Sequence, residues 1–176
     1  LNKLVYPGIV DFLKPVLLDS SESIDLRDLV IDIAVKGKLT DFVEPLLTVA
    51  ARQEETDHTR SSAILAVGKL GSRDECQRLV PLLASDLDSD SYDKIRGALL
   101  TTIWPHRLVS VEDLFAILKV PQRESYLGVY KLFLMQTLCE NLKQEDLPVA
   151  LKWCSQLTPR VPTYGACHDA IESIVG

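Results

Sequence analysis

The chain has 176 residues, of which 47% are hydrophobic and 25% charged, and its formal net charge is −6 at pH 7. This composition is typical of a folded globular protein and excludes an intrinsically disordered chain. The acidic balance disfavours nucleic acid and membrane-surface partners, because both need an excess of basic residues. No apolar stretch reaches the roughly 18 residues of a membrane helix, and no signal peptide is recognisable.

These features predict a cytoplasmic protein, and the four cysteines agree with that. None of them forms a C-x-x-C pair, and each lies in an apolar, helical neighbourhood. We therefore expect reduced and partly buried thiols rather than disulfides. The chain begins at Leu1 rather than at methionine and is apolar from its first residues, so we expect it to be part of a longer protein.

Two elements recur along the chain. The first is an apolar helical pattern interrupted by a proline: DFLKPVLLDS, DFVEPLLTVA and CQRLVPLLAS, with Pro15, Pro45 and Pro81. The second contains a leucine: VKGKLTD, AVGKLGS, WPHRLVS and CENLKQE, with Leu39, Leu70, Leu108 and Leu142 at separations of 31, 38 and 34 residues. The residues expected to cap the helices that follow are Thr40, Ser72, Ser110 and Gln144. Ser72 with Glu75 matches the capping box, in which two side chains satisfy free N–H groups at a helix start.

The recurrence predicts five pairs of helices. The first helices are expected near 8–19, 40–53, 72–85, 110–120 and 144–157. Their partners are expected near 24–37, 57–70, 90–104, 124–141 and 164–175. On the second helix the predicted apolar face consists of Leu26, Leu29, Val30 and Ile33. No segment alternates as a strand does.

A single two-helix unit cannot bury its apolar face alone, whereas stacked units share a continuous core. The expected fold is therefore all-α: one domain over residues 1–176, built as a right-handed α-solenoid of about five two-helix repeats. The last helix stays apolar at Ile171, Ile174 and Val175, where a terminal repeat would be polar. This predicts that another repeat follows in the parent protein.

The unit of 31–38 residues, with a proline in its first helix, resembles HEAT-like repeats. The segment from Ala98 to Trp153 is similar to a helical region downstream of the nucleotide-binding domain in large bacterial NACHT-type NTPases. The similarity lies in a Trp-Pro corner, a Ser-Val-Glu-Asp-Leu helix start and a Tyr-rich helix, in this order. The resemblance implies a sensor or scaffold arm. The chain lacks G-x-x-x-x-G-K-[ST], so any NTPase activity would lie outside it.

Lys38, Lys69 and Arg107 occupy the same position in successive repeats, just before the recurring leucine. Stacked repeats would align the three side chains along one edge. Two interpretations remain open. The basic charges are favourable at helix C-termini, and they are also suited to docking an acidic partner or a neighbouring domain.

Two further clusters contain residue types that occur in metal or catalytic sites. The acidic stretch with Asp86, Asp88 and Asp90 has Ser91 and Gly97 where a calcium loop requires glycine and a bidentate carboxylate. We expect it to be a solvated loop that caps the next helix.

Cys167 and His168 are adjacent, and neighbouring residues on a helix point about 100° apart. The sequence therefore predicts no catalytic, metal or cofactor site.

The aromatic residues Tyr126, Tyr130 and Phe133 lie at i, i+4 and i+7. They are expected to pack between repeats rather than to line a ligand groove, with the tyrosine hydroxyls hydrogen-bonded.

Taken together, the patterns favour a non-enzymatic scaffold or sensor arm that contacts a protein partner or a flanking domain of its parent chain. The alternatives are an enzyme on similar repeats, such as a chromophore lyase or a DNA glycosylase, and a purely structural spacer. The sequence leaves the oligomeric state open.

Overall fold

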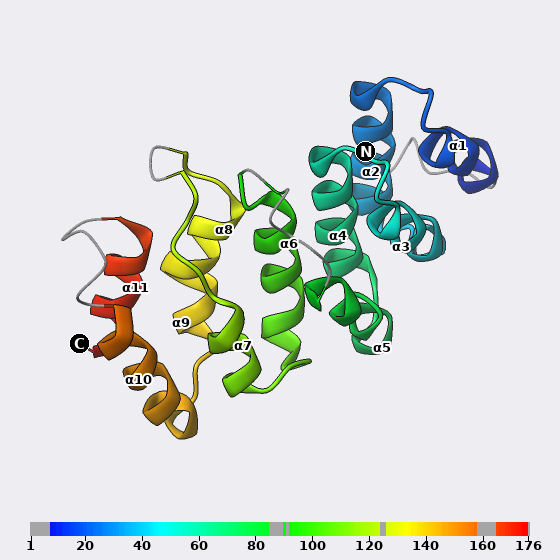
Figure 1. Ribbon diagram of the computed structural model, residues 1–176. Coiled ribbons are helices and arrows are strands. Elements are labelled where there is room, and N and C mark those ends of the chain that lie inside the picture. Colours follow the sequence, from blue (N-terminus) through cyan, green and yellow to red (C-terminus); the bar gives the residue numbers. More distant parts are fainter. Residues whose placement is uncertain (1–7, 85–89, 91, 124–125, 158–164, 176) are drawn as a thin grey trace. The chain divides into compact units, whose positions relative to one another are not determined.

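The computed structural model describes residues 8–84, 90, 92–123, 126–157 and 165–175 (Figure 1). The regular elements among them are all helical, which confirms the all-α prediction for this part of the chain. The chain divides into two compact units, Leu1–Ser85 and Asp86–Gly176, and each is described by itself.

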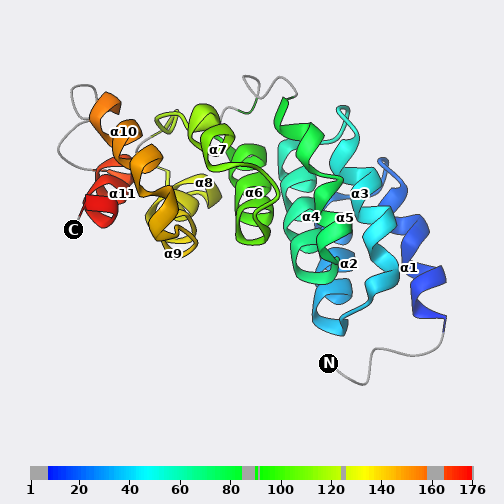
Figure 2. The same ribbon diagram turned by 90° about the horizontal axis from the view of Figure 1, so that it is seen from below.

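In unit 1, alternate helices form two layers (Figures 1 and 2). Helix α1 packs against α3, α2 packs against α4, and each layer contacts the other. The core between them includes Leu17, Phe42, Leu46 and Ile64, none of which is exposed. The elements are α1 (Ile9–Leu18), α2 (Ile24–Gly37), η1 (Thr40–Phe42), α3 (Val43–Ala51), α4 (Asp57–Leu70), α5 (Arg73–Gln77) and η2 (Val80–Ala84).

Unit 2 repeats this alternation. Helices α7 and α10 pack together, while α6 packs against α8, and α11 packs against the turn that follows α8. Its elements are α6 (Lys94–Ile103), η3 (Trp104–His106), α7 (Val111–Ile117), α8 (Val129–Leu132), the π-helical turn η4 (Phe133–Thr137), α9 (Leu138–Glu140), η5 (Gln144–Asp146), α10 (Leu147–Leu157) and α11 (Ala166–Val175).

Side-chain caps account for the helix starts that were predicted well. Ser23 and Thr56 accept hydrogen bonds from the third residue of α2 and α4, so both helices begin where expected. The capping box at Ser72 is confirmed, and Ser110 caps α7. The caps predicted at Thr40 and Gln144 are wrong, because each is the first residue of a 3-10 turn instead.

The helix expected over 72–85 is broken. Helix α5 ends at Gln77, and Pro81 lies in the 3-10 segment η2. A proline has no N–H to continue an α-helix, and its ring crowds the preceding turn. Pro45 behaves differently, because it lies in the first turn of α3, where no backbone donor is needed.

The buried face of α2 differs from the prediction. Val30 is buried, but Leu26 and Leu29 are 39% and 55% exposed. The buried residues of α2 are Arg27, Val30, Ile31 and Ala34. A charged side chain thus takes a core position that hydrophobic periodicity had given to leucine.

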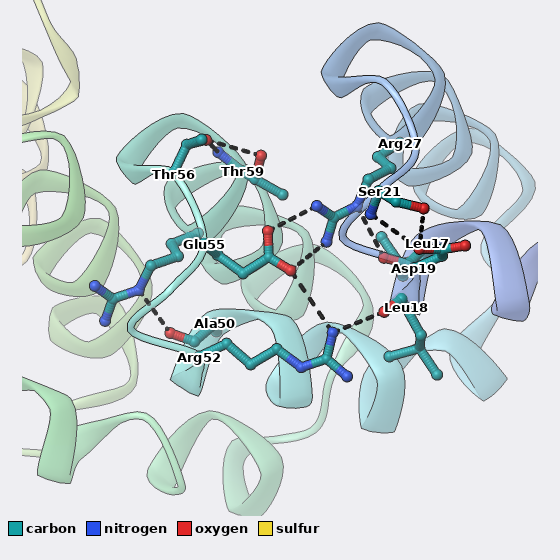
Figure 3. A network of polar contacts seen from close by, with 11 residues as sticks. Leu17, Leu18, Asp19, Ser21, Arg27, Ala50, Arg52, Glu55, Thr56 and Thr59 are labelled. Carbon is teal, nitrogen blue, oxygen red and sulfur yellow. Dashed lines mark hydrogen bonds and ion pairs between the residues drawn. The ribbon is translucent and has the colours of Figure 1, made fainter.

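Arg27 is compensated by the polar network in Figure 3. Its guanidinium forms two 2.6 Å hydrogen bonds with the Glu55 carboxylate, and both side chains are 3% exposed. Its Nε donates to the carbonyl of Leu17 at 3.0 Å, which ties α2 to the end of α1. Arg60 on α4 donates in the same way to the carbonyl of Ala50 at 3.2 Å. Each arginine thereby anchors its helix to the end of the preceding one.

In unit 2, Asp90 takes the capping role that was predicted for its loop. Its carboxylate accepts hydrogen bonds from the backbone N–H groups of Lys94, Ile95 and Arg96, the first three residues of α6. The expectation of a solvated side chain is wrong at this position, because Asp90 is 1% exposed. Asp86 and Asp88 lie outside the described residues.

Helix α6 approaches α8 closely at Gly97. A Cβ atom at this position would lie 2.7 Å from Tyr130 Cα, well inside van der Waals contact. Tyr130 and Phe133 are buried as predicted, and the Tyr130 hydroxyl donates to the carbonyl of Lys119 at 2.6 Å. The prediction is wrong for Tyr126, which precedes α8, is 39% exposed and packs edge-on against Tyr92.

Candidate functional site

Lys38 and Arg107 adopt the same helix-ending conformation. Both lie in the left-handed region, at φ 52° and 53°. In both cases the next residue donates its N–H to the carbonyl five residues before it, from Leu39 to Ala34 and from Leu108 to Ile103. This is the Schellman motif, in which an apolar residue packs just beyond the helix end. The recurring basic-leucine pair therefore has a local structural cause at two of its positions.

Lys69 does not share this conformation. Helix α4 continues to Leu70, and the backbone of the following residue, Gly71, is extended. Lys38 and Lys69 lie at the C-terminal ends of α2 and α4, which pack side by side in unit 1. Arg107 belongs to unit 2. The common edge of all three residues therefore stays a prediction.

Arg107 binds several groups within its own unit. Its guanidinium stacks 4.1 Å from the Trp104 ring centre and donates to Asp146 at 2.7 Å and to the carbonyl of Asn141 at 3.2 Å. The hydrogen bond from Arg107 lowers the pKa of the Asp146 carboxyl, which is 3% exposed. These contacts tie the end of η3 to the segment between α9 and α10. The side chain that sequence suggested for docking thus has a structural role here.

A groove with a volume of about 450 Å³ lies between α2 and α4. Its floor is apolar and includes Ile31, Leu65 and Ala66. Asp25, Asp28, Asp32 and the exposed Leu29 line the α2 side, and Ser62 and Lys69 line the α4 side. An apolar floor with charged rims is suited to an amphipathic binding partner.

One hydrogen bond and one ion pair involve the aspartates of this groove. His58 at the start of α4 lies 2.6 Å from Asp28 Oδ2 and joins the two helices. Lys36 lies 2.7 Å from Asp32, one turn away on α2. Within the described structure, the second oxygen of Asp28 is buried without a hydrogen-bond partner. The N-terminal end of the groove is therefore acidic, with Asp25 and Asp28, while Lys69 lies at its other end.

The remaining sequence candidates show no converging chemistry. Cys167 is buried, whereas His168 is partly exposed and lies 3.3 Å from Glu172 on the same helix. The four cysteines form no disulfide with one another; three of them are buried and Cys139 is half-buried. In the part of the chain that the structure describes, no three His, Cys, Asp or Glu side chains gather to hold a metal ion.

Comparisons with known proteins add no relative: no family model, curated protein or solved structure matches this chain. Within the described residues, every helix is too short or too polar to span a bilayer.

Sequence reasoning missed the α2–α4 groove. A usable signal was present, because Asp25, Asp28 and Asp32 follow one another at i, i+3 and i+7 and so lie along one face of a helix. Leu29 lies among them, but its spacing to Val30 and Ile33 predicts a core position instead. The buried position of Arg27 and the exposure of Leu29 together show that this face of α2 points outward.

Proposed function

We propose that the chain is a non-enzymatic helical-repeat scaffold, which makes protein–protein or interdomain contacts within a larger bacterial NACHT-type NTPase. Its fold would be a right-handed α-solenoid of about five HEAT-like pairs of helices. In this function the chain offers surfaces between parallel helices rather than a reaction centre, and coupling between flanking domains passes through the stacked helices.

The observation that carries this proposal is a recurring arginine bond in unit 1. Arg27 and Arg60 lie 33 residues apart, and each donates from Nε to the carbonyl ten residues before it. Equivalent contacts at this spacing are expected when one supersecondary unit is repeated along a chain. The shared helix ends at Lys38 and Arg107 support the same interpretation, since 69 residues correspond to about two repeats.

The test is capture of a partner by the immobilised chain from lysate of its source organism, with bound proteins identified by mass spectrometry. The double variant Lys38→Ala, Lys69→Ala removes two exposed charges and should reduce capture of the specific partner at least tenfold. Because Arg107→Ala also removes the Asp146 contact, it is measured separately and its thermal stability is compared.

The proposal fails if the wild-type chain captures no specific partner, or if the isolated chain turns over a substrate. Tight binding of a tetrapyrrole, seen as a change in visible absorbance, would favour the lyase alternative instead. Wild-type capture with no effect of the double variant would retain the scaffold and exclude the basic edge as its docking surface.

A further inference from the structure

The α2–α4 groove has a defined direction. Asp28 is in the second turn of α2 and His58 is the second residue of α4, and their hydrogen bond places the two N-terminal ends together. At the other end, Val35 and Lys69 line the same groove. The two helices therefore run parallel, with the groove between them.

The length and lining of the groove fit a helix. Asp25 and Val35 are ten residues apart on α2, a distance of about 15 Å at 1.5 Å per residue. This matches about three helical turns of a ligand. The apolar floor is suited to side chains that recur at i, i+3 or i+4 and i+7 on one face of that ligand.

The charges select the orientation of the ligand. Asp25 lies at the N-terminal end and Lys69 lies at the C-terminal end, while Asp28 is hydrogen-bonded to His58 and Asp32 is paired with Lys36. Helices commonly carry acidic residues in their first turn and basic residues in their last. A helix that runs antiparallel to α2 and α4 places its basic end over Asp25 and Asp28, and its acidic end over Lys69.

The dipoles of α2 and α4 also favour these charges. Leu29 is 55% exposed among three carboxylates of this face. An apolar contact from a ligand would remove that leucine from water and so stabilise the complex.

We propose that this groove binds an amphipathic helix of a partner protein, antiparallel to α2 and α4, with acidic residues in its first turn and basic residues in its last. The proposal rests on the scaffold function and specifies one of its surfaces. It differs from the basic edge, with which it shares Lys69.

Two fluorescein-labelled, hydrocarbon-stapled peptides of 14 residues test this orientation. Both carry leucines on one face. The forward peptide has two glutamates in its first turn and two lysines in its last, and the reversed peptide exchanges these charges. Fluorescence anisotropy with the complete chain should show that the forward peptide binds at least tenfold more tightly.

Three variants locate the binding site. The exposed side chain of Leu29 makes Leu29→Ser compatible with folding, and this variant should weaken the forward peptide at least fivefold. The double variant Asp25→Lys, Lys69→Glu should prefer the reversed peptide. Asp41→Lys is the matched control, because Asp41 is an exposed aspartate of unit 1 outside the groove lining; it should leave both affinities unchanged.

Equal affinities for the two peptides, no binding of either, or an unchanged preference in the double charge variant would overturn the proposal. These outcomes leave the scaffold function intact if the chain still captures a partner from lysate. Conversely, failure of that capture with the peptide preference intact would reject the proposed function and retain the groove as a helix-binding site.

Discussion

Removal of one partner of the buried Arg27–Glu55 pair is expected to destabilise unit 1 strongly. In Arg27→Met, the Glu55 carboxylate stays 3% exposed and loses both of its 2.6 Å hydrogen bonds. Breaking such a pair from one side costs about 3–5 kcal/mol. Arg52 lies 3.6 Å from the same carboxylate and retains part of the compensation, so we expect about 3 kcal/mol.

The double variant Arg27→Met, Glu55→Leu removes both charges and should be more stable than either single variant. Its remaining defect is the carbonyl of Leu17, which loses the Nε donor. An unpaired buried carbonyl costs about 1–3 kcal/mol. The double-mutant cycle should therefore give a coupling energy of at least about 2 kcal/mol.

The cycle also has a defined pH dependence. The hydrogen bond from Arg27 lowers the pKa of Glu55 below its ordinary value. A depressed folded-state pKa contributes stability that is present above the unfolded-state pKa, about 4.3 for glutamate, and lost as pH falls through the folded-state value. The coupling energy should be constant from pH 6 to 7 and should shrink below about pH 4.

The assay is urea unfolding followed by far-ultraviolet circular dichroism at 25 °C. With a slope of about 1.5 kcal/mol/M, a loss of 3 kcal/mol moves the midpoint by about 2 M. Both tryptophans, Trp104 and Trp153, lie in unit 2, so their fluorescence reports that unit separately. A coupling energy below about 0.5 kcal/mol at pH 7 would refute the reasoning, because the pair would then not determine the stability of unit 1.

Three further predictions concern the contact at Gly97, two helix ends and the cysteine thiols. Gly97→Ala should destabilise unit 2 by about 3 kcal/mol, seen as a lower thermal midpoint, because the added methyl group overlaps the backbone of Tyr130; an unchanged midpoint would contradict the close approach. Lys38→Gly should stabilise the chain by about 1 kcal/mol, since glycine adopts the left-handed conformation without strain. Arg107→Gly should instead destabilise the chain, because the contacts of the arginine side chain are lost. Urea midpoints of the two variants that shift in the same direction would refute this. Burial raises the pKa of the thiols of Cys76, Cys139 and Cys154. Ellman's reagent at pH 8 should therefore label the native chain more slowly than the urea-unfolded chain. Equal labelling rates of the two states would contradict the burial of these thiols.

The helices could be predicted where local chemistry decides their ends. Helices α2 and α4 match their expected bounds, because Ser23 and Thr56 cap them and their apolar residues recur at helical spacing. The expected 72–85 helix failed because Pro81 interrupts the pattern that predicted it. A proline was tolerated in α1 and α3, so the sequence alone could not distinguish these cases.

The candidate site was predicted less well, for a different reason. The basic residues occupy the same position in successive repeats, which predicted that they lie in one row. The contacts of Arg107, however, depend on Asp146, which is 39 residues away in the sequence. The burial of Arg27 depends in the same way on Glu55, 28 residues away. Periodicity within one helix carries no information about such distant partners, so it assigned the buried face to leucines.

The orientation of α2 about its own axis determines both the buried Arg27–Glu55 pair and the lining of the α2–α4 groove. Residues that follow one another on a helix are about 100° apart, so Leu29 lies about 160° around the axis from Arg27, and Asp25 lies on the same side as Leu29. When Glu55 holds Arg27 inside, Leu29 and Asp25 must therefore face outward. Unit 1 uses a charged residue in the core and leaves a leucine among carboxylates at the surface. The ion pair thus fixes the orientation in which α2 contributes its acidic and apolar side chains to the groove.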